Sequence, residues 1–467
     1  MQPAVFHLPP ELEAALRTPR YSIAVKGAPG TGKSTLAMEI LSFFGGGSSL
    51  YVSSRVSLEQ IYRDFPWLKD EITEKSIIDM TNAGKTEKRS EFLFFDKPRF
   101  LSYLLSRVKE LKRPRIVIFD SIEALRSILD MKSQELTLEH SLMSLIQETD
   151  ANAVFVLESK AEHKIEYMVD GVIRLEYRLI DGRRTRRLII EKLRGVEIQQ
   201  STYPFTLKDS RLSCPSRITL KILDFKEKHK VINDENRHDY QGRPAYSTGN
   251  KSFDEFIGGG YPKGALVLFE LSKDAPPEMI THVCGATVEN FLMQDRPVVE
   301  IPAPVSTPQK EKNMYRIMVH PEKLKNAVIL WPEKESDETV VYVTGGAEEW
   351  AETAISEIER MKNTTGKPAL LVFSCDTIVS ALGREGASEF VTIISRYIKD
   401  GDDLLILVSV ENSEFLSNIR KMADIYIKVM CDSGMPLLYG VAPWTPVYMF
   451  TIDVSKPHPE IVLLPIL

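Results

Sequence analysis

The sequence predicts an α/β fold made of two tandem domains, each with a mostly parallel central sheet, flanking helices and a C-terminal antiparallel hairpin. Short apolar runs alternate with helical patterns, which is typical of parallel sheets. A hairpin pattern of alternating polarity then closes the first half, and the second half repeats several marks of the first. We expect a first domain over residues 1–225, a polar linker over 226–244 and a second domain over 245–467.

Composition places the chain among ordinary globular proteins. Its 467 residues are too many for one hydrophobic core, and 43% of them are hydrophobic and 27% charged. No apolar run approaches the roughly 18 residues of a membrane span, and the N-terminus lacks a signal-peptide pattern. The four cysteines are widely spaced, which favours reduced core thiols over a zinc site or a disulfide framework. We therefore expect a cytoplasmic protein without membrane contact.

The net charge of −6 argues against a dedicated nucleic-acid-binding protein. Basic residues are nevertheless concentrated in residues 160–230, which hold 17 Lys and Arg against 10 Asp and Glu. Part of this charge is the run Arg183-Arg184-Thr185-Arg186-Arg187. Such a run is more often the solvated tip of a hairpin than a phosphate-binding surface, so nucleic-acid binding is the less favoured interpretation.

A complete phosphate-binding loop stands near the start of the chain. Its residues are Gly27, Ala28, Pro29, Gly30, Thr31, Gly32, Lys33, Ser34 and Thr35. An apolar strand pattern from Tyr21 to Val25 precedes it and a helix pattern begins at Leu36, which is the context that the motif requires. The glycines allow backbone N–H groups to point inward at phosphate oxygens, at the positive end of the helix. The sequence therefore predicts a nucleoside triphosphate site.

Four side chains around this loop have expected chemical roles. Lys33 is placed to reach the β- and γ-phosphates and to act in catalysis, and the Ser34 hydroxyl is placed to ligate Mg²⁺. An apolar strand ends at Asp120, whose carboxylate would hold the same ion through water; alternatively, Asp120 only caps the helix that follows. A further apolar strand ends at Glu158. Because the carboxyl ends of parallel strands meet at one edge of a sheet, both acids should lie beside the loop.

An antiparallel hairpin follows these strands. Val172 to Leu179 and Arg187 to Lys192 alternate in polarity around a turn at Asp181-Gly182, and the second strand continues toward Arg194. Charged side chains on an edge strand commonly discourage aggregation, and the residues alone favour that interpretation for Lys192 and Arg194.

Together these motifs resemble a RecA-type ATPase domain of the KaiC-like branch. The resemblance rests on the phosphate-binding loop, the strand "IVIFDS", the segment "VDGVIRLEYR…RRLIIEKLRG" and the "YPFTL" that follows. It implies ATP and Mg²⁺ as ligands and assembly into a homo-oligomer. It also implies that Lys192 and Arg194 act in catalysis across a subunit interface, by stabilising charge on a neighbour's γ-phosphate.

The chain departs from that family at the expected catalytic acids. KaiC-like domains carry two adjacent glutamates after the second strand, and Arg55 and Val56 occupy those positions here. Arginine cannot act as a base at neutral pH. By position Glu158 and Glu123 are the nearest acids, and Glu158 is the candidate base. Hydrolysis is therefore left open: it recruits another acid, is slow or is absent.

A second resemblance points to regulation. The segments "YVSSRVS…YRDFPWL" and "LPPEL" look like the archaeal group around the gas-vesicle regulatory protein GvpD, which is itself similar to KaiC and RecA. This resemblance covers most of the first domain. It implies a nucleotide-dependent regulator that works through a protein partner.

The second half of the chain repeats the RecA-like sequence motifs but lacks the phosphate-binding loop. A KaiC-like lead-in and an apolar strand from Ala265 to Phe269 are present. The residues that follow, Glu270 to Glu278, contain no glycine and include two prolines that lack N–H donors. We expect a degenerate RecA-like domain that does not bind ATP, in which Asp376 is the counterpart of Asp120.

Three functions remain open on this basis. The first is a Mg²⁺-dependent ATPase that acts as an oligomeric regulator. The second is a nucleotide-gated interaction protein with little or no hydrolysis, which Arg55 and Val56 favour. The third and least favoured is a DNA recombination or repair ATPase, which rests on the fold and the basic segment 160–230.

Overall fold

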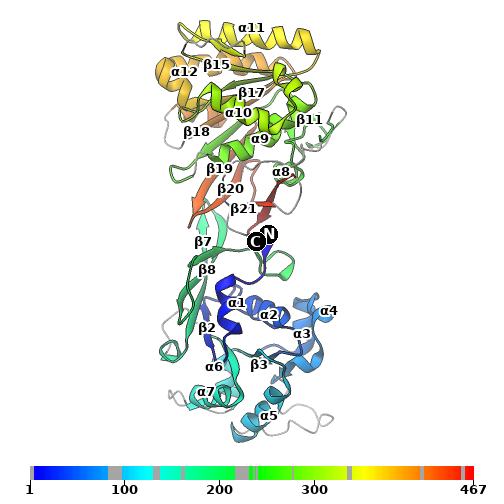
Figure 1. Ribbon diagram of the computed structural model, residues 1–467, viewed down its shortest axis with the longest axis vertical. Helices are drawn as coiled ribbons and strands as arrows, with labels where there is room; N and C mark the ends of the chain where they lie inside the picture. Colours follow the sequence, from blue (N-terminus) through cyan, green and yellow to red (C-terminus); the bar gives the residue numbers. More distant parts are fainter. Residues whose placement is uncertain are drawn as a thin grey trace. The chain divides into compact units, whose positions relative to one another are not determined.

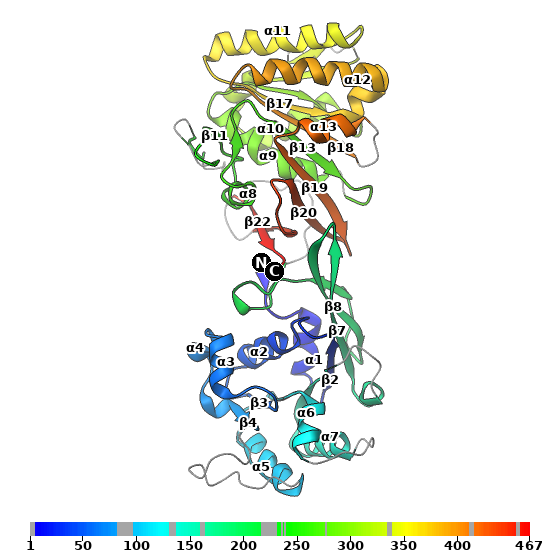
Figure 2. The same cartoon turned by 180° about the vertical axis from the view of Figure 1, so that it is seen from behind.

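The chain forms two compact units in the computed structural model. The structure describes residues 5–81, 97–129, 137–158, 164–215, 231–234, 237, 240–275, 278–333, 339–410, 415–453 and 458–467. The N-terminal unit comprises the described residues up to 215 together with 466–467, and the C-terminal unit comprises those from 231 to 465. Figure 1 and Figure 2 show both units from opposite sides.

The N-terminal unit is built on a mixed, mostly parallel sheet. Its described strands run in the order β4-β3-β5-β6-β2-β7-β8-β9. The pairs from β4 to β7 are parallel, whereas β7, β8 and β9 pair antiparallel. The strand bounds are β2 Ser22–Gly27, β3 Ser49–Ser53, β4 Ile77–Asp79, β5 Arg115–Asp120, β6 Ala151–Val156, β7 Gly171–Ile180, β8 Arg183–Leu193 and β9 Thr202–Pro204, with a separate pair of β1 Val5–Phe6 and β10 Cys214–Pro215.

Helices cover both faces of this sheet (Figure 2). One face packs against α1, α2, α3 and α4, and the other against α5, α6 and α7, each through its own cluster of buried apolar side chains. Central strands such as β2 and β6 are buried along their whole length, which explains their continuous apolar sequence. The helix bounds are α1 Pro10–Arg17, α2 Lys33–Phe44, α3 Leu58–Asp64, α4 Leu68–Glu71, α5 Lys97–Glu110, α6 Ile122–Ile128 and α7 Thr137–Thr149, with short 3₁₀ turns at Glu74–Ser76, Lys164–Tyr167 and Lys208–Ser210.

The C-terminal unit has a second mixed sheet, with the strand order β16-β15-β14-β17-β18-β13-β19-β20-β21-β22. Its pairs are parallel from β16 to β19 and antiparallel from β19 to β22. The strand bounds are β13 Leu266–Leu271, β14 Val298–Ile301, β15 Ala327–Trp331, β16 Val340–Tyr342, β17 Leu370–Ser374, β18 Leu404–Val410, β19 Ile425–Asp432, β20 Met435–Ala442, β21 Tyr448–Asp453 and β22 Glu460–Pro465, with a separate pair of β11 Ala245–Tyr246 and β12 Tyr261–Pro262.

Helices again form a layer on each face of the second sheet. The helices α8, α9 and α10 pack on one face, and α11, α12 and α13 pack on the other. The long helices α11 and α12 lie side by side in both views (Figure 1). The helix bounds are α8 Lys251–Ile257, α9 Glu278–Met293, α10 Pro308–Met318, α11 Ala347–Thr365, α12 Cys375–Lys399 and α13 Leu416–Met422, with a 3₁₀ turn at Pro321–Asn326.

The two sheets share their strand order around one central strand. β13 lies between β18 and β19, as β2 lies between β6 and β7. The hairpins that follow also match, because the register shifts between Val172 and Ile173 in β7 and between Tyr426 and Ile427 in β19. The α/β fold with mostly parallel sheets is confirmed. The domain boundaries stay a prediction, since residues 226–230, 235–236 and 238–239 of the expected linker 226–244 lie outside the described residues.

Strand register corrects one expected equivalence. Asp120 pairs with Val156, and Ser374 pairs with Val408 at the matching level of the C-terminal sheet. Ser374, and not Asp376, is therefore the counterpart of Asp120. The apolar strand β17 ends at Ser374, whose hydroxyl caps α12, so Asp376 falls in the first turn of that helix.

None of the helices in the described part of the chain has both the length and the apolar character that crossing a membrane requires. The cytoplasmic location stays a prediction. Three of the four cysteines, Cys214, Cys284 and Cys375, are buried, and all four are free thiols.

Candidate functional site

A cavity of about 580 Å³ opens at the carboxyl ends of β2, β3, β5 and β6 in the N-terminal unit. Parallel α/β sheets bind ligands at this edge, and the volume is sufficient for a nucleotide. The cavity is lined by Pro29, Gly30, Gly32, Lys33, Ser34, Thr35, Tyr51, Arg55, Val56, Gln60, Asp120, Ser121, Val156, Leu157, Glu158 and Leu207. The structure thus brings most of the predicted site residues together.

The loop between β2 and α2 has the backbone of a phosphate cradle. Gly30 and Gly32 have φ angles of 74° and 101°, which glycine adopts without strain. A Cβ on Gly32 would lie 3.2 Å from the side chain of Leu207. The helix α2 begins directly after Gly32, so its N-terminal N–H groups and the positive end of its dipole lie at the cavity.

Arg186 supports this loop from the hairpin. Its Nη1 donates a hydrogen bond to the carbonyl oxygen of Gly30 at 2.9 Å. Arg184 lies over the ring of Tyr177, with its guanidinium carbon 5.1 Å from the ring centre. The interpretation of the arginine run as a solvated tip is therefore wrong for Arg186, because spacing in the sequence does not reveal which side of a hairpin reaches back to the loop.

Lys33 extends across the loop toward the preceding strand. Its Nζ donates to the carbonyl oxygens of Gly27 at 2.7 Å and Ala28 at 3.1 Å. Burial lowers the pKa of Lys33, whereas nearby carboxylates, led by Asp120, act in the opposite direction and Arg55 adds to the lowering. Phosphate oxygens bind an ammonium more strongly than neutral carbonyl oxygens do. Lys33 is therefore placed where its ammonium group can exchange these carbonyl oxygens for the phosphate oxygens of a bound triphosphate.

Ser34 and Asp120 line the same cavity, and their side-chain oxygen atoms can ligate a metal ion. Asp120 ends β5 and is buried, and the Tyr51 hydroxyl donates to its Oδ2 at 2.7 Å. Burial and the charge of Asp120 raise the pKa of Tyr51 well above its usual value, so the phenol remains a donor. Mg²⁺ takes oxygen ligands, commonly one or two protein groups together with phosphates and water. The donor set fits Mg²⁺.

The alternative role of Asp120 as a helix cap is wrong. Ser121 is the cap of α6, and its hydroxyl accepts the N–H of Ala124 at 3.3 Å. The carboxylate of Asp120 is directed to Tyr51 instead. Sequence reasoning did not single out Tyr51, although a tyrosine one strand away from an expected metal ligand is a signal that could have found it.

Arg55 and Glu158 form an ion pair inside the cavity. Arg55 Nη1 lies 3.2 Å from Glu158 Oε1, and the Ser121 hydroxyl donates to the same oxygen at 2.6 Å. The backbone N–H of Glu158 donates to Glu123 Oε1 at 3.2 Å. The candidate base is thus paired with the arginine that stands at one of the expected glutamate positions.

Lys192 and Arg194 are not brought to this cavity within one chain. Lys192 Nζ donates to the carbonyl oxygen of Glu166 at 3.0 Å, and Arg194 Nη1 lies 3.9 Å from Asp170 Oδ1. Neither is among the described residues that line the cavity. Their action on a neighbour's γ-phosphate stays a prediction.

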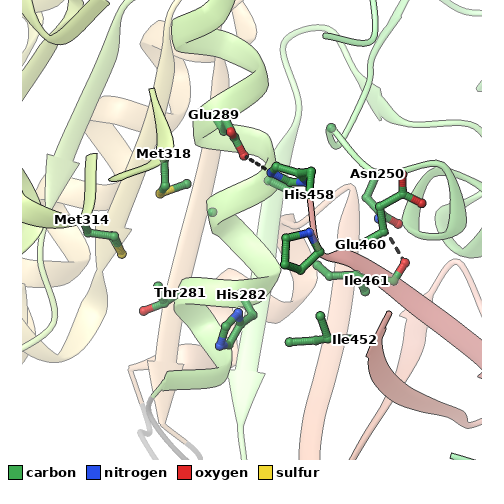
Figure 3. Close-up of a pocket in the computed structure, with 14 residues that line it drawn as sticks. Asn250, Thr281, His282, Glu289, Met314, Met318, Ile452, His458, Glu460 and Ile461 are labelled. Carbon is green, nitrogen blue, oxygen red and sulfur yellow. Dashed lines mark hydrogen bonds and ion pairs between the residues drawn. The ribbon is translucent and has the colours of Figure 1, made fainter. Parts of the chain in front are cut away.

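The C-terminal unit contains a smaller cavity of about 70 Å³, near α9, α10 and β22 (Figure 3). His458 Nε2 lies 3.4 Å from Glu289 Oε2 at its wall, and Asn250 donates to the carbonyl oxygen of Ile461 at 3.0 Å. A space of this size accommodates a few water molecules and not a nucleotide. It offers no second nucleotide site.

Residues 17–214 match the model of the family described as "ATPase: KaiC". The matched segment contains the phosphate-binding loop, the cavity, the Arg55–Glu158 pair and the hairpin. The N-terminal unit is a KaiC-like ATPase domain. This confirms the resemblance drawn from the motifs of the sequence.

The KaiC-like domain belongs to a chain with relatives of matching length. Protein GvpD2 of Halobacterium salinarum is 25% identical, over 98% of this chain and 98% of the relative. Protein GvpD1 of the same organism is 22% identical, over 95% and 93%. A UPF0273 protein of Pyrococcus furiosus is 25% identical over 41% of this chain and 83% of its own length. The resemblance to the GvpD group is confirmed as homology.

Proposed function

We propose that this chain binds ATP with Mg²⁺ in its KaiC-like domain and acts as a nucleotide-dependent regulator whose own hydrolysis is slow. The observation that carries this proposal is a single cavity that joins Lys33, Ser34 and Asp120 to the Arg55–Glu158 ion pair. The first three residues fit a triphosphate with its metal ion. The ion pair occupies the place where a hydrolytic domain of this kind would hold its glutamates.

Each part of the site has a binding role. The N–H groups of the loop and the Lys33 ammonium would hold the β- and γ-phosphates. Ser34 and Asp120 would hold Mg²⁺, and Tyr51 orients the Asp120 carboxylate. When bound, the ion neutralises charge on the phosphates. Arg186 holds the loop through its hydrogen bond to the carbonyl oxygen of Gly30.

The C-terminal unit is proposed to be a degenerate copy of the first domain. Its strand β13 leads into a segment without the glycines of the loop, and Ser374 replaces Asp120. In the matching hairpin, Ala442 and Trp444 stand where Lys192 and Arg194 stand in the first. Such a copy would serve assembly or the binding of a protein partner. The homology to GvpD1 and GvpD2 along nearly the whole chain supports a shared regulatory role.

A second candidate is an oligomeric ATPase completed by a neighbouring subunit. It is favoured by the position of Lys192 and Arg194 away from their own cavity, and by the exposure of 59% of the Arg194 side chain. The DNA recombination hypothesis ranks third, because Arg186, one of the basic residues on which it rests, is engaged with the phosphate-binding loop.

One experiment separates the slowly hydrolysing regulator from the oligomeric ATPase. Size-exclusion chromatography with light scattering, with and without ATP and Mg²⁺, is combined with phosphate release on the same samples of wild type and Lys33→Ala. We expect the wild type to bind ATP and to release phosphate slowly. We expect Lys33→Ala not to bind ATP. Rapid phosphate release by the wild type without a partner would contradict slow hydrolysis, and an ATP-dependent increase in mass would favour the oligomeric ATPase.

A further inference from the structure

The backbone beside Arg55 is held by hydrogen bonds, whereas the Arg55 side chain is largely exposed to water. The Ser54 hydroxyl donates to the carbonyl oxygens of Asp120 at 2.9 Å and Ser121 at 3.0 Å. These bonds tie the segment after β3 to the end of β5. The side chain of Arg55 is 59% exposed, and its Nη1 lies 3.2 Å from Glu158 Oε1. The base of the side chain is therefore fixed at the cavity and its tip can turn.

The ion pair between Glu158 and Arg55 is weak. An ion pair as exposed as that between Arg55 and Glu158, whose side chain is 38% exposed, contributes little because water screens it. A terminal phosphate carries more charge than one carboxylate and matches the two-pronged geometry of a guanidinium. Arg55 also lies near enough to Lys33 to add to the lowering of its pKa, a shift that burial dominates. A γ-phosphate bound by Lys33 would therefore compete for Arg55.

We infer that Arg55 is the residue by which this site distinguishes a nucleoside triphosphate from a diphosphate. With a γ-phosphate present, Arg55 leaves Glu158 and binds the phosphate; with a diphosphate it stays paired with Glu158. The inference rests on the proposed function, since it assumes that nucleotide binds beside Lys33. It gives the proposed regulator a way to sense the phosphate state within one chain.

The test compares the affinities of ADP and the non-hydrolysable ATP analogue AMP-PNP, both with Mg²⁺, by calorimetry on the full chain. Arg55→Ala should weaken AMP-PNP binding by about 10- to 100-fold and change ADP binding less than about threefold. Arg63→Ala is the matched control, because this arginine is exposed and lies outside the lining of the cavity. It should leave both affinities unchanged. Equal effects of Arg55→Ala on both nucleotides, or no effect, would overturn the inference.

A double variant distinguishes two roles for Arg55: binding the γ-phosphate directly, and neutralising the negative charge of Glu158. Arg55→Ala also exposes the negative charge of Glu158, which would itself repel a γ-phosphate. If Arg55 binds the phosphate, Arg55→Ala/Glu158→Gln should still lack most of the preference for AMP-PNP over ADP. Glu158→Gln alone should strengthen that preference by about two- to fivefold, since it releases Arg55. Wild-type preference in the double variant would show that Arg55 only neutralises Glu158, and would overturn the inference.

The outcomes also separate this inference from the proposed function. If the wild type binds neither nucleotide, the proposed function fails and the inference fails with it. If the wild type binds both and Lys33→Ala binds neither, while Arg55→Ala retains the wild-type preference, only the inference fails. Thermal unfolding of each variant shows whether it is folded. If Arg55→Ala does not fold, Arg55→Lys takes its place in the test. Because this variant retains the positive charge, it should keep part of the preference for AMP-PNP over ADP.

Discussion

Lys26 Nζ lies 2.7 Å from Glu166 Oε2, and the C-terminal unit carries the same ion pair with its charges exchanged. At the matching positions Glu270 accepts two hydrogen bonds from Arg420, at 2.6 and 2.9 Å. In both units the first residue of the pair lies on the central strand and the second precedes the next strand. An exchange of this kind preserves the attraction in a buried place, and it supports the origin of both units from one repeated domain.

The exchanged pair makes a prediction about stability. Lys26→Glu should lower the free energy of unfolding by about 3–5 kcal/mol, because it leaves three carboxylates close together: the new Glu, Glu166 and Glu191, which lies 2.9 Å from Lys26. Adding Glu166→Arg should recover a large part of this loss. Urea unfolding followed by circular dichroism measures both changes. Lys109→Glu, which breaks an exposed pair with Glu148, is the control and should change stability by less than about 1 kcal/mol. A double variant no more stable than Lys26→Glu alone would count against the equivalence.

Tyr51→Phe tests the metal-binding role of Asp120. The substitution removes the hydrogen bond to the Asp120 carboxylate and leaves the ring in place. We expect the concentration of Mg²⁺ that gives half-maximal ATP binding to rise about tenfold, as for other residues that orient a metal ligand. Titration of Mg²⁺ at fixed ATP measures it. Nucleotide binding without Mg²⁺ should stay unchanged, and an unchanged Mg²⁺ requirement would remove Tyr51 from this role.

The C-terminal unit should lose stability as pH rises, because of Glu300 on β14. Burial, reinforced by the charge of Glu311, raises the pKa of Glu300 from 4.5 to about 8, against a hydrogen bond from Tyr315. Between these two values the folded unit keeps a proton that the unfolded chain has released. Stability contributed by this group is therefore present below pH 4.5 and is lost as pH rises toward 8, with a slope of up to about 1.4 kcal/mol per pH unit.

Glu300→Gln checks the sign of that dependence. The amide can still accept the hydrogen bond from Tyr315 but cannot ionise. Thermal unfolding from pH 5 to pH 8 should show a flatter dependence than in the wild type, with the largest stabilisation at pH 8. Glu348→Gln, at an exposed position of α11, should leave the dependence unchanged. A steeper decline in Glu300→Gln would show that the assignment is wrong.

Mixing two inactive variants tests whether subunits complete one another's sites. In the oligomeric ATPase, Lys33→Ala removes the nucleotide from its own subunit but retains Arg194, whereas Arg194→Ala retains Lys33. Each variant alone should release phosphate at least tenfold more slowly than the wild type. Their mixture should regain a fraction of wild-type activity, which should grow with protein concentration. Full activity of Arg194→Ala alone would exclude this role.

The sequence predicted most of the site because its parts are local. The phosphate-binding loop is continuous in the chain, and Asp120 and Glu158 end apolar strands whose carboxyl ends meet at one edge of a parallel sheet. The strand patterns also indicated both sheets. None of these inferences required knowledge of how side chains pack.

What the sequence did not predict depends on side chains that meet across strands. Tyr51 contacts Asp120 from the neighbouring strand, and Arg186 reaches the loop from the hairpin. The pairing of Arg55 with Glu158 joins residues more than a hundred positions apart and depends on the order β3-β5-β6. The misplaced equivalence of Asp376 arose because a strand end cannot be located to within two residues from apolar pattern alone.

The central claim is that Lys33 belongs to a working ATP site, and calorimetric titration of ATP with Mg²⁺ into wild type and Lys33→Ala tests it most directly. The account predicts saturable binding of one ATP per chain in the wild type, and at least a hundredfold weaker binding in a Lys33→Ala variant that unfolds at the wild-type temperature. Equal affinity in the two proteins, or two ATP molecules per chain, would contradict it.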